Sequence, residues 1–562
     1  MTGNVKFEAP GEGPWELDAS HFDRPFPRYG VGWFTEGFER GQAKWFERVG
    51  IPMKSVQIAL VHGMPYGQPV PLVGSPKNLA KPPPPAWIMK VMMFLHPAMR
   101  RRKANAERWV AQKGWREDFR RWDEEVKPAL LARFAALEAE PIEQLDDAAM
   151  VDHLWRCGEA VRDNMIAHFD TNAMVVPVGG YLRRAHEWTG ASIVEIVGAL
   201  AGSGACDDLN AALSRLARSL REVDDGPKLL NGGRTPSQAL AHLRERDDDL
   251  GDAARAWLSL VEHRMVSAGD FATPIGKEMP EVLLGQVRGA LDAPPPAAAS
   301  ASASDAILDR APAEHREELA FWLGEARRVH RGRDERSTLC DSWAMGLVRR
   351  ALLEVGRRLA DRRALHDAEH VVDLEHAEIE ALLSGADEPS ADAVAARVAH
   401  RQSLRIDDAP MYLGVDSAPP LPPLDAFGGA LGEIMKALFF YMEHMEKDAE
   451  ESESPAEVIR GLPASHGTYR GPARVIGGPD DFGRVEHGDV LVVRATMPAY
   501  NILLPVVGAI VTDRGGALCH AAIVSREYGL PCVVGTREAT KRIEDGSMVE
   551  VDGDAGTVTL VG

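Results

Sequence analysis

The chain has 562 residues, of which 45% are hydrophobic and 26% are charged, a composition typical of globular proteins and too apolar for wholesale disorder. At about 100 to 200 residues per domain, we expect about three or four structural units. The formal net charge of -20 argues against nucleic acid as a partner, because nucleic-acid binding depends on Lys and Arg side chains that neutralise phosphates.

From the first residues of the chain we expect no export signal. The first residues, MTGNVKFEAPGEGPWEL, lack the basic and apolar regions of a signal peptide. The longest apolar stretch, residues 86–99, is interrupted by Lys90, His96 and Pro97 and is too short to cross a ~30 Å hydrocarbon core. We therefore expect a cytoplasmic protein without a membrane partner, and we predict that residues 86–99 form a buried or partner-facing helix.

The first hundred residues are rich in aromatic and methionine side chains. Such side chains most often pack a core, and less often line a pocket for a flat apolar ligand. Both interpretations stay open for Trp15, Phe22, Phe26, Tyr29, Trp33, Phe34, Trp45, Met64, Tyr66, Met92 and Met93.

The middle of the chain is predicted to be mainly helical. Between residues 104 and 445, apolar side chains recur at three- and four-residue spacing, as in LSRLARSLREV. Three tracts rich in proline and small residues, 81–85, 292–304 and 417–423, are typical of extended linkers. An acidic run that begins at Glu446 and closes at Pro455 marks the main boundary.

After Pro455 the pattern changes to short β-rich runs that are bounded by glycine. These runs are GPARVIGG, GDVLVVRA, GAIVTD and PCVVG, and the chain closes with the hairpin pattern SMVEVDGDAGTVTLVG. One amphipathic helix is predicted among them, over residues 520–528. The five cysteines of the chain show neither CxxC pairs nor a zinc-like His cluster, so we expect no disulfide framework and no metal site.

The segment that carries chemistry is VTDRGGALCHAAIVSREYGLPCVVG, residues 511–535. A buried strand leads into Gly515 and Gly516, where the backbone can approach a ligand closely, and then into a short helix. His520 falls in the first turn of that helix, where unpaired amide donors and the helix dipole stabilise phosphate or a phosphorylated imidazole.

Histidine suits a phosphoryl relay, because neutral imidazole attacks a phosphoryl group at physiological pH and later releases it to an acceptor. The alternative is a core histidine whose nitrogens are satisfied by hydrogen bonds, which is the commoner case for an isolated histidine. The paired glycines and the helix start favour the relay.

The sequence TDRGGALCHAAIVSREYGLPCVVGT resembles the phosphohistidine signature of the phosphoenolpyruvate-utilising enzymes. The preceding GLPASHGTYRGPARVI resembles the first strands of the same domain, so that the resemblance covers residues 461–562. It implies a β/β/α domain that swings on a linker between two sites and carries the phosphoryl group on His520. Residues that match the loop around the histidine, and for which the resemblance implies a phosphate-cradle role, are Thr512, Arg514, Gly515, Gly516 and Cys519. Leu518 stands where the dikinases have a regulatory threonine, so that control by phosphorylation is not expected here.

Two large parts of these enzymes have no counterpart within the 562 residues. We find neither an ATP-grasp pattern nor a Walker sequence before the helical region, and we expect no barrel that binds phosphoenolpyruvate. We therefore expect an ATP-grasp-type partner subunit to bind Mg-ATP and to load His520, and we expect no cofactor bound tightly to this chain.

The helical region is similar, more weakly, to the acceptor-binding domain of rifampin phosphotransferases and phenylphosphate synthases. The similar segments are WELDASHFDRPFPRYG, VEHRMVSAGDF and the stretch that begins ARRVHRGRDERSTLCDSW. In one departure, Glu262 stands where the relatives tend to have glycine. Transfer to a hydroxyl requires a base and cations. The candidates for these roles are His263, Arg264, Arg333, Asp334 and Arg336, although solvated helix faces and interhelix ion pairs are the commoner explanation for any single one of them.

The sequence thus predicts a multidomain α+β protein. Its segments are an N-terminal part of the acceptor-binding region (1–103), a mainly helical acceptor-binding domain (104–445), an acidic hinge (446–457) and the phosphohistidine domain (458–562). The predicted function is transfer of a phosphoryl group, through His520, from an ATP-loaded partner to a small organic hydroxyl, with phenols as candidates. Two alternatives stay open: a phosphoenolpyruvate-linked relay with a protein partner, and a non-catalytic binding module.

Overall fold

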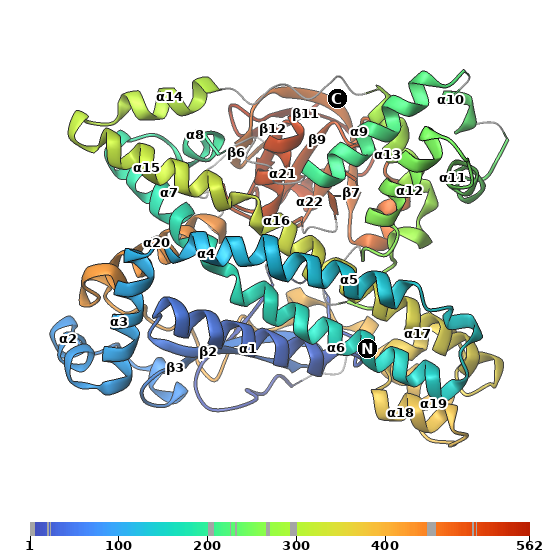
Figure 1. Ribbon diagram of the computed structural model, residues 1–562, viewed down its shortest axis with the longest axis horizontal. Helices are drawn as coiled ribbons and strands as arrows, with labels where there is room; N and C mark the ends of the chain where they lie inside the picture. The colour runs from blue at the N-terminus through green and yellow to red at the C-terminus, as the bar shows by residue number, and fades with distance from the viewer. Residues whose placement is uncertain are drawn as a thin grey trace. The chain divides into compact units, whose positions relative to one another are not determined.

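The computed structural model describes most of the chain (Figure 1). The described residues are 6–19, 22, 24–200, 207–224, 226–230, 233–265, 270–292, 301–446, 457–496, 500–501 and 503–561. The chain divides into two compact units, each assembled from three segments that are distant in sequence. Unit 1 comprises Met1–Val176, Ala268–Ala272 and Arg336–Leu438; unit 2 comprises Pro177–Ser267, Thr273–Glu335 and Phe439–Gly562.

The predicted fold class is confirmed, because a large helical region precedes a C-terminal mixed β-sheet. The predicted segment boundaries group the residues differently from the two units and stay a prediction. Of the predicted hinge 446–457, residues 447–456 lie outside the described residues. So do residues 293–300 of the predicted linker 292–304, whose last part begins α14 (Ala301–Arg310) instead.

Unit 1 is built around the packing of α1 (Val31–Val49) against α6 (Asp147–Asp170). Two glycines of α1 allow the close approach. A Cβ on Gly37 would lie 2.5 Å from the carbonyl oxygen of Arg162, and one on Gly41 would lie 2.8 Å from Cβ of Phe169. Larger residues at these positions would push the helices apart. The other helices of the unit are α2 (Ala86–Leu95), α3 (Pro97–Ala111), α4 (Gly114–Arg121), α5 (Lys127–Glu138), α17 (Ala344–Asp361), α18 (His376–Leu383), α19 (Ala391–Ser403) and the first part of α20 (Gly429–Glu446).

A small antiparallel sheet completes unit 1. Its order is β2 (Met53–Val61), β3 (Met64–Pro71), β1 (Trp15–Leu17) and β4 (Tyr412–Leu413). The β2–β3 hairpin turns at His62 and Gly63, which both have positive φ, as a two-residue hairpin turn requires. Trp15, Met64 and Tyr66 of the predicted aromatic and methionine set are buried in the core of this sheet.

The predicted helix over residues 86–99 is shorter in the structure: α2 ends at Leu95, and Pro97 begins α3. Helix α2 is not buried: Trp87, Val91, Phe94 and Leu95 are exposed, and these positions recur at helical spacing. Among the described helices, none is both long enough and apolar enough to cross a membrane.

Unit 2 contains the C-terminal sheet and the helices α7 (Val175–Thr189, from Pro177), α8 (Ile193–Gly198), α9 (Asp207–Glu222), α10 (Gly226–Leu229), α11 (Pro236–Arg244), α12 (Asp249–Val261), α13 (Pro280–Asp292), α14, α15 (Ala313–His330) and α16 (Gly332–Arg336, to Glu335). One helical core joins α9, α11, α12 and α13 around Trp257.

The C-terminal sheet, orange to red in Figure 1, has the order β5-β12-β11-β7-β8-β9-β10-β6. The neighbouring pairs from β7 to β10 are parallel and the outer pairs are antiparallel. Apolar side chains cover both faces, because central strands such as VLVV are buried on both sides. One face packs against α21, and α22 lies over the other core. The elements are β5 (Val458–Arg460), β6 (Leu462–Ser465), β7 (Thr468–Ile476), β8 (Val490–Val493), β9 (Ala509–Thr512), α21 (His520–Tyr528), β10 (Cys532–Val534), α22 (Ala539–Arg542), β11 (Met548–Asp552) and β12 (Thr557–Leu560).

Candidate active site

The site lies at the carboxyl ends of β8 and β9. These strands are parallel neighbours, with Val493 opposite Thr512, so the loops that follow them leave the sheet at the same edge. In parallel sheets this edge is where ligands bind. The loop after β8 carries Thr496, and the loop after β9 runs through the paired glycines to α21.

His520 is the first residue of α21 and follows Cys519, the N-cap. Its side chain is buried, with 8% of the residue exposed. Nδ1 lies 2.9 Å from the hydroxyl oxygen of Thr496, whereas the buried Nε2 has no hydrogen-bond partner among the described residues. A hydroxyl oxygen accepts a hydrogen bond from Nδ1–H, and in that tautomer Nε2 keeps a lone pair.

The surroundings keep the His520 imidazole neutral. Burial, together with the positive charge of Arg333, lowers its pKa to about 3. Neutral imidazole is the nucleophilic form, because the lone pair is free to form a bond. His520 is therefore ready to attack an electrophile across the physiological pH range.

Two guanidinium groups hold the loop that precedes His520. Nη1 of Arg333, in α16, donates to the carbonyl oxygen of Leu518 at 2.6 Å. Nη1 of Arg526, in α21, donates to that of Ala517 at 2.9 Å, while its Nη2 is buried without a partner among the described residues. Burial lowers the pKa of Arg526 to about 10, so this side chain stays cationic at neutral pH. Both charges would stabilise a phosphoryl group.

A second histidine belongs to this cluster. His330, the last residue of α15, is 6% exposed. Burial lowers its pKa to about 4, and the charges of Arg333 and Arg526 add to the effect. It is therefore neutral at physiological pH. Sequence reasoning missed His330, Arg526 and Thr496, although His330 and Arg526 stand inside segments whose resemblance had been noted.

The glycine loop has a backbone that few residues adopt. Gly515 has φ of +113, and a Cβ there would lie 2.8 Å from Sγ of Cys519. The N–H of Gly516 donates to the carbonyl oxygen of Met445 at 3.0 Å, and the N–H of Leu518 donates to that of His444 at 3.3 Å. These two amides therefore satisfy the last carbonyls of α20, and they would bind a phosphate only after exchanging those partners.

The remaining residues of the predicted cradle shape the loop. The hydroxyl of the buried Thr512 donates to the carbonyl oxygen of Arg514 at 2.8 Å, and the Arg514 side chain is exposed. Burial raises the pKa of the Cys519 thiol. Backbone N–H donors of α21 and the charges of Arg333 and Arg526 lower this pKa, but by less than burial raises it. The cradle role of these residues stays a prediction.

The predicted acceptor-site residues are scattered. His263 and Arg264 lie in the turn after α12, where the carbonyl oxygen of Arg264 accepts from the N–H of Gly276 at 3.0 Å. Arg333 reaches the His520 loop, as described. The side chain of Asp334 lies outside the described residues. Arg336, in unit 1, is buried and donates to the carbonyl oxygen of His168 and to Oδ1 of Asn172, so it anchors the end of α6.

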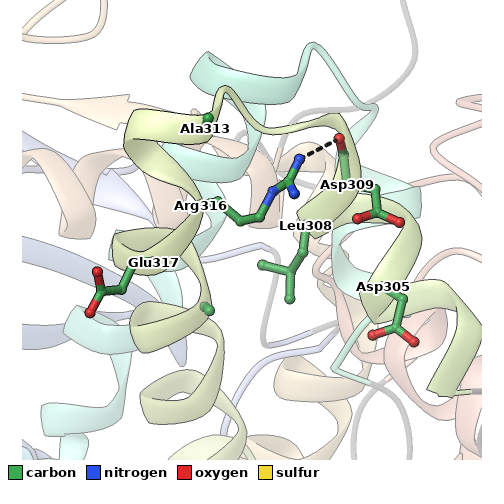
Figure 2. Close-up of a pocket in the computed structure, with 7 residues that line it drawn as sticks. Asp305, Leu308, Asp309, Ala313, Arg316 and Glu317 are labelled. Atoms are coloured by element: carbon green, nitrogen blue, oxygen red, sulfur yellow. Dashed lines mark hydrogen bonds between the residues drawn. The ribbon is translucent and has the colours of Figure 1, made fainter.

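An open hollow of about 660 Å³ lies between α14 and α15 in unit 2, and its polar lining includes Asp305, Asp309, Arg316 and Glu317. Figure 2 shows the Arg316 guanidinium turned toward Asp309, whose carbonyl oxygen accepts from it at 3.3 Å. None of the lining residues belongs to the His520 cluster. In the described part of the chain, no three His, Cys, Asp or Glu side chains gather in a group that could hold a metal ion.

Residues 485–556, which contain β8, β9, the glycine loop and α21, match the model of the mobile domain of PEP-utilising enzymes. This part of the chain belongs to that domain family. The mobile domain thus supplies His520, Thr496 and Arg526, whereas Arg333 and His330 come from helices that precede it in the chain.

Three relatives show how far the likeness extends. The uncharacterized phosphotransferase YvkC of Bacillus subtilis is 34% identical over 230 residues, which are 41% of this chain and 25% of the relative. The phosphoenolpyruvate synthase of Pyrococcus furiosus is 46% identical over 116 residues, 21% of this chain and 14% of the relative. The rifampicin phosphotransferase of Bacillus cereus is 44% identical over 107 residues, 19% and 12% respectively. This chain therefore spans a quarter or less of each of these relatives.

Proposed function

We propose that this chain is a phosphotransferase component in which His520 receives a phosphoryl group at Nε2 and passes it to the hydroxyl of a small organic acceptor. The observation that carries the proposal is the state of the His520 ring. Thr496 contacts Nδ1, Nε2 is buried and has no partner among the described residues, and the charge of Arg333 acts on the ring. The match of residues 485–556 to the mobile domain supports the same chemistry.

The donor in this proposal is an ATP-grasp-type protein that holds Mg-ATP. The Nε2 lone pair forms a bond to the β-phosphorus of ATP, the bond from that phosphorus to the AMP oxygen breaks with its electron pair on AMP, and water releases the γ-phosphate as inorganic phosphate. In this proposal Arg333, whose charge acts on the ring, offsets the negative charge that then arrives there, and Arg526, which holds the same loop, adds to the effect. In the tautomer that carries a proton on Nδ1, this nitrogen donates to the Thr496 hydroxyl, and the contact holds the ring in place while the bond to phosphorus forms.

The acceptor is a hydroxyl compound, with phenols as the first candidates. Support for this class comes from the weak similarity of the helical segments to acceptor-binding domains and from the relatives named as phosphotransferases. A second candidate is a relay that takes its phosphoryl group from phosphoenolpyruvate, and the likeness to phosphoenolpyruvate synthases over the mobile domain favours it.

The test measures the covalent intermediate. The purified chain is incubated with ATP labelled at the β-phosphate, with and without a candidate ATP-grasp partner, and separately with labelled phosphoenolpyruvate. We expect label that acid releases and base does not, on the wild type and not on His520→Ala. The matched control is His487→Ala, which removes an exposed histidine of the same domain and should keep the label.

The outcomes separate the candidates. Label that needs the partner and His520 supports the ATP-dependent function, and label from phosphoenolpyruvate alone supports the second candidate. Absence of label with every donor contradicts both and leaves a binding module. Label that persists in His520→Ala means that another residue carries the phosphoryl group.

A further inference from the structure

Unit 1 contains a row of aromatic side chains that runs from the N-terminal segment across α1 to the end of α6. Ring centroids are 6.0 Å apart for Phe22 and Phe34, and 4.3 Å apart for Phe38 and Phe169. Phe34 is buried, whereas Phe22, Phe38 and Phe169 keep part of their surface exposed. Part of the apolar surface of these rings therefore stays accessible to a flat ligand.

A histidine and a carboxylate lie at the end of this row. The His168 ring is 4.6 Å from that of Phe169, centroid to centroid. Nδ1 of His168 lies 2.9 Å from Oδ1 of Asp341, within ion-pair distance, and both atoms are buried and have no hydrogen-bond partner among the described residues. A carboxylate this close to one imidazole nitrogen favours one orientation of the ring and leaves the other nitrogen available to a ligand.

Asp341 is presented by an irregular turn. It lies in the π-helical segment Ser337–Trp343, between α16 and α17. Single π-helical turns are rare and frequently occur at functional sites. On the other side of the pair, Arg336 holds the carbonyl oxygen of His168, which fixes the last turn of α6.

A third polar side chain stands one helical turn before His168. Asn164 is fully buried, and neither its Oδ1 nor its Nδ2 has a partner among the described residues. Residues four apart on a helix share a face, so Asn164 and His168 lie on the same side of α6. A buried amide without partners is destabilising, and it is therefore explained best by a polar group that binds there.

We propose that Asn164, His168 and Asp341 form the binding site for the acceptor hydroxyl, and that the aromatic row receives the ring of a phenol. This inference rests on the proposed function and gives it a substrate class and a proton acceptor. Asn164 hydrogen-bonds the phenol oxygen, and Nε2 of His168 takes its proton.

The transfer step balances with these groups. The phenol oxygen forms a bond to the phosphorus carried by His520, and the N–P bond breaks with its electron pair on the imidazole nitrogen. The phenol proton moves to Nε2 of His168, and the Asp341 carboxylate stabilises the resulting imidazolium. The products are an aryl phosphate and a neutral His520, and His168 then releases its proton to solvent.

The first measurement needs no phosphoryl donor. The full chain is titrated with 4-nitrophenol, whose phenolate form absorbs visible light, at a pH where free 4-nitrophenol is mostly protonated. We expect binding with growth of the phenolate band. His168→Gln should weaken binding at least tenfold and abolish the band, and Asp341→Asn should reduce the band. The control His366→Gln, at an exposed histidine of the same unit, should change neither.

Asn164→Ala separates a ligand-binding role from a structural one. Removing two buried polar atoms and introducing a better helix former should raise the melting temperature by a few degrees. The same variant should weaken 4-nitrophenol binding several-fold. A structural asparagine would instead lower the melting temperature and leave binding unchanged.

The proposal is overturned if 4-nitrophenol does not bind, or if His168→Gln and Asn164→Ala bind it as the wild type does while their circular dichroism spectra remain native. Because His520 labelling is measured separately, the two failures are distinguishable. If His520 is labelled but 4-nitrophenol does not bind, only the proposed acceptor site is contradicted. If 4-nitrophenol binds but His520 is never labelled, the proposed function is contradicted, and with it the role of this site as an acceptor site.

Discussion

At the scale of single residues, the His520 cluster combines a neutral nucleophile with permanent cations. His520 and His330 are buried and have depressed pKa values, whereas Arg333 and Arg526 keep their charge. Arg333 disfavours protonation of both imidazoles, and Arg526 disfavours protonation of His330. A phosphoryl group on Nε2 would bring negative charge that a nearby cation stabilises. Positive charge near the ring therefore favours neutral His520 before transfer and phosphorylated His520 after it.

The depressed pKa values predict how stability responds to acid. An unfolded histidine has a pKa near 6.5, so the unfolded chain binds a proton at each histidine below that pH. In the folded chain, His520 and His330 are protonated only near pH 3 and pH 4, respectively. Stability should therefore fall as pH falls, by about 2 kcal/mol for each histidine between pH 7.5 and 5. Denaturant unfolding of wild type, His520→Gln and His330→Gln measures this. Each variant should show the smaller pH dependence, and equal slopes in all three proteins would contradict the assignment.

The hydrogen bond between Thr496 and His520 predicts a kinetic effect. Thr496→Val removes the hydroxyl with little change in shape, so the ring loses its fixed tautomer and orientation. We expect the rate of His520 phosphorylation to fall about tenfold, since a hydrogen bond of this kind is worth about 1 to 2 kcal/mol. Thr496→Ser is the matched control and should retain most of the rate. A Thr496→Val protein that is labelled as fast as wild type would show that the hydroxyl is dispensable.

At the scale of elements, the region after Pro455 follows its sequence pattern closely. The predicted helix over residues 520–528 is α21 with the same bounds, and the closing hairpin is β11 and β12. Local signals are strong here, because a glycine directly follows β5, β7, β10 and β11, and Gly529 caps the helix in a left-handed conformation. The partners of the loop were not predictable in this way. Arg333 and the end of α20 are distant in sequence, and only the folded chain brings them to residues 516–518.

The backbone of the glycine loop predicts a specific cost for alanine. Gly515 combines positive φ with a close approach to Cys519, so Gly515→Ala adds a clash to backbone strain. Gly529→Ala is the matched control, because Gly529 also has positive φ but no described atom lies within 4 Å of the place its Cβ would take. We expect about 1 kcal/mol of lost stability for Gly529→Ala and about 2 to 4 kcal/mol for Gly515→Ala. Equal losses in chemical denaturation would rule out the predicted clash.

At the scale of the whole molecule, the segments of the two compact units alternate along the chain. Unit 1 and unit 2 are each made of three segments, so residues that are close in sequence, such as Glu335 and Arg336, belong to different units. The sequence pattern predicts where helices and linkers alternate, but it does not predict which segments belong to the same compact unit. Composition and periodicity report local preference, whereas the grouping depends on long-range contacts.

The two units predict a stability experiment on the intact chain. Leu154 in unit 1 and Val492 in unit 2 are both fully buried. Truncating either to alanine leaves a cavity and should cost about 2 to 4 kcal/mol. We expect calorimetry to show more than one transition, with Leu154→Ala lowering one and Val492→Ala lowering another. If both variants lowered every transition equally, the chain would unfold as a single cooperative unit.

The sequence by itself determined the fold class, the elements of the C-terminal sheet, and the histidine at the start of α21, because glycine spacing, strand patterning and helix starts are local properties. It did not determine which side chains surround that histidine. Thr496 reaches Nδ1 because β8 and β9 are parallel neighbours, and Arg333 reaches the loop because unit 2 includes α16. The contact between His168 and Asp341, 173 positions apart, likewise exists only once α6 and the π-helical segment are packed. Such contacts come from tertiary packing, which sets distances between side chains that sequence spacing leaves free.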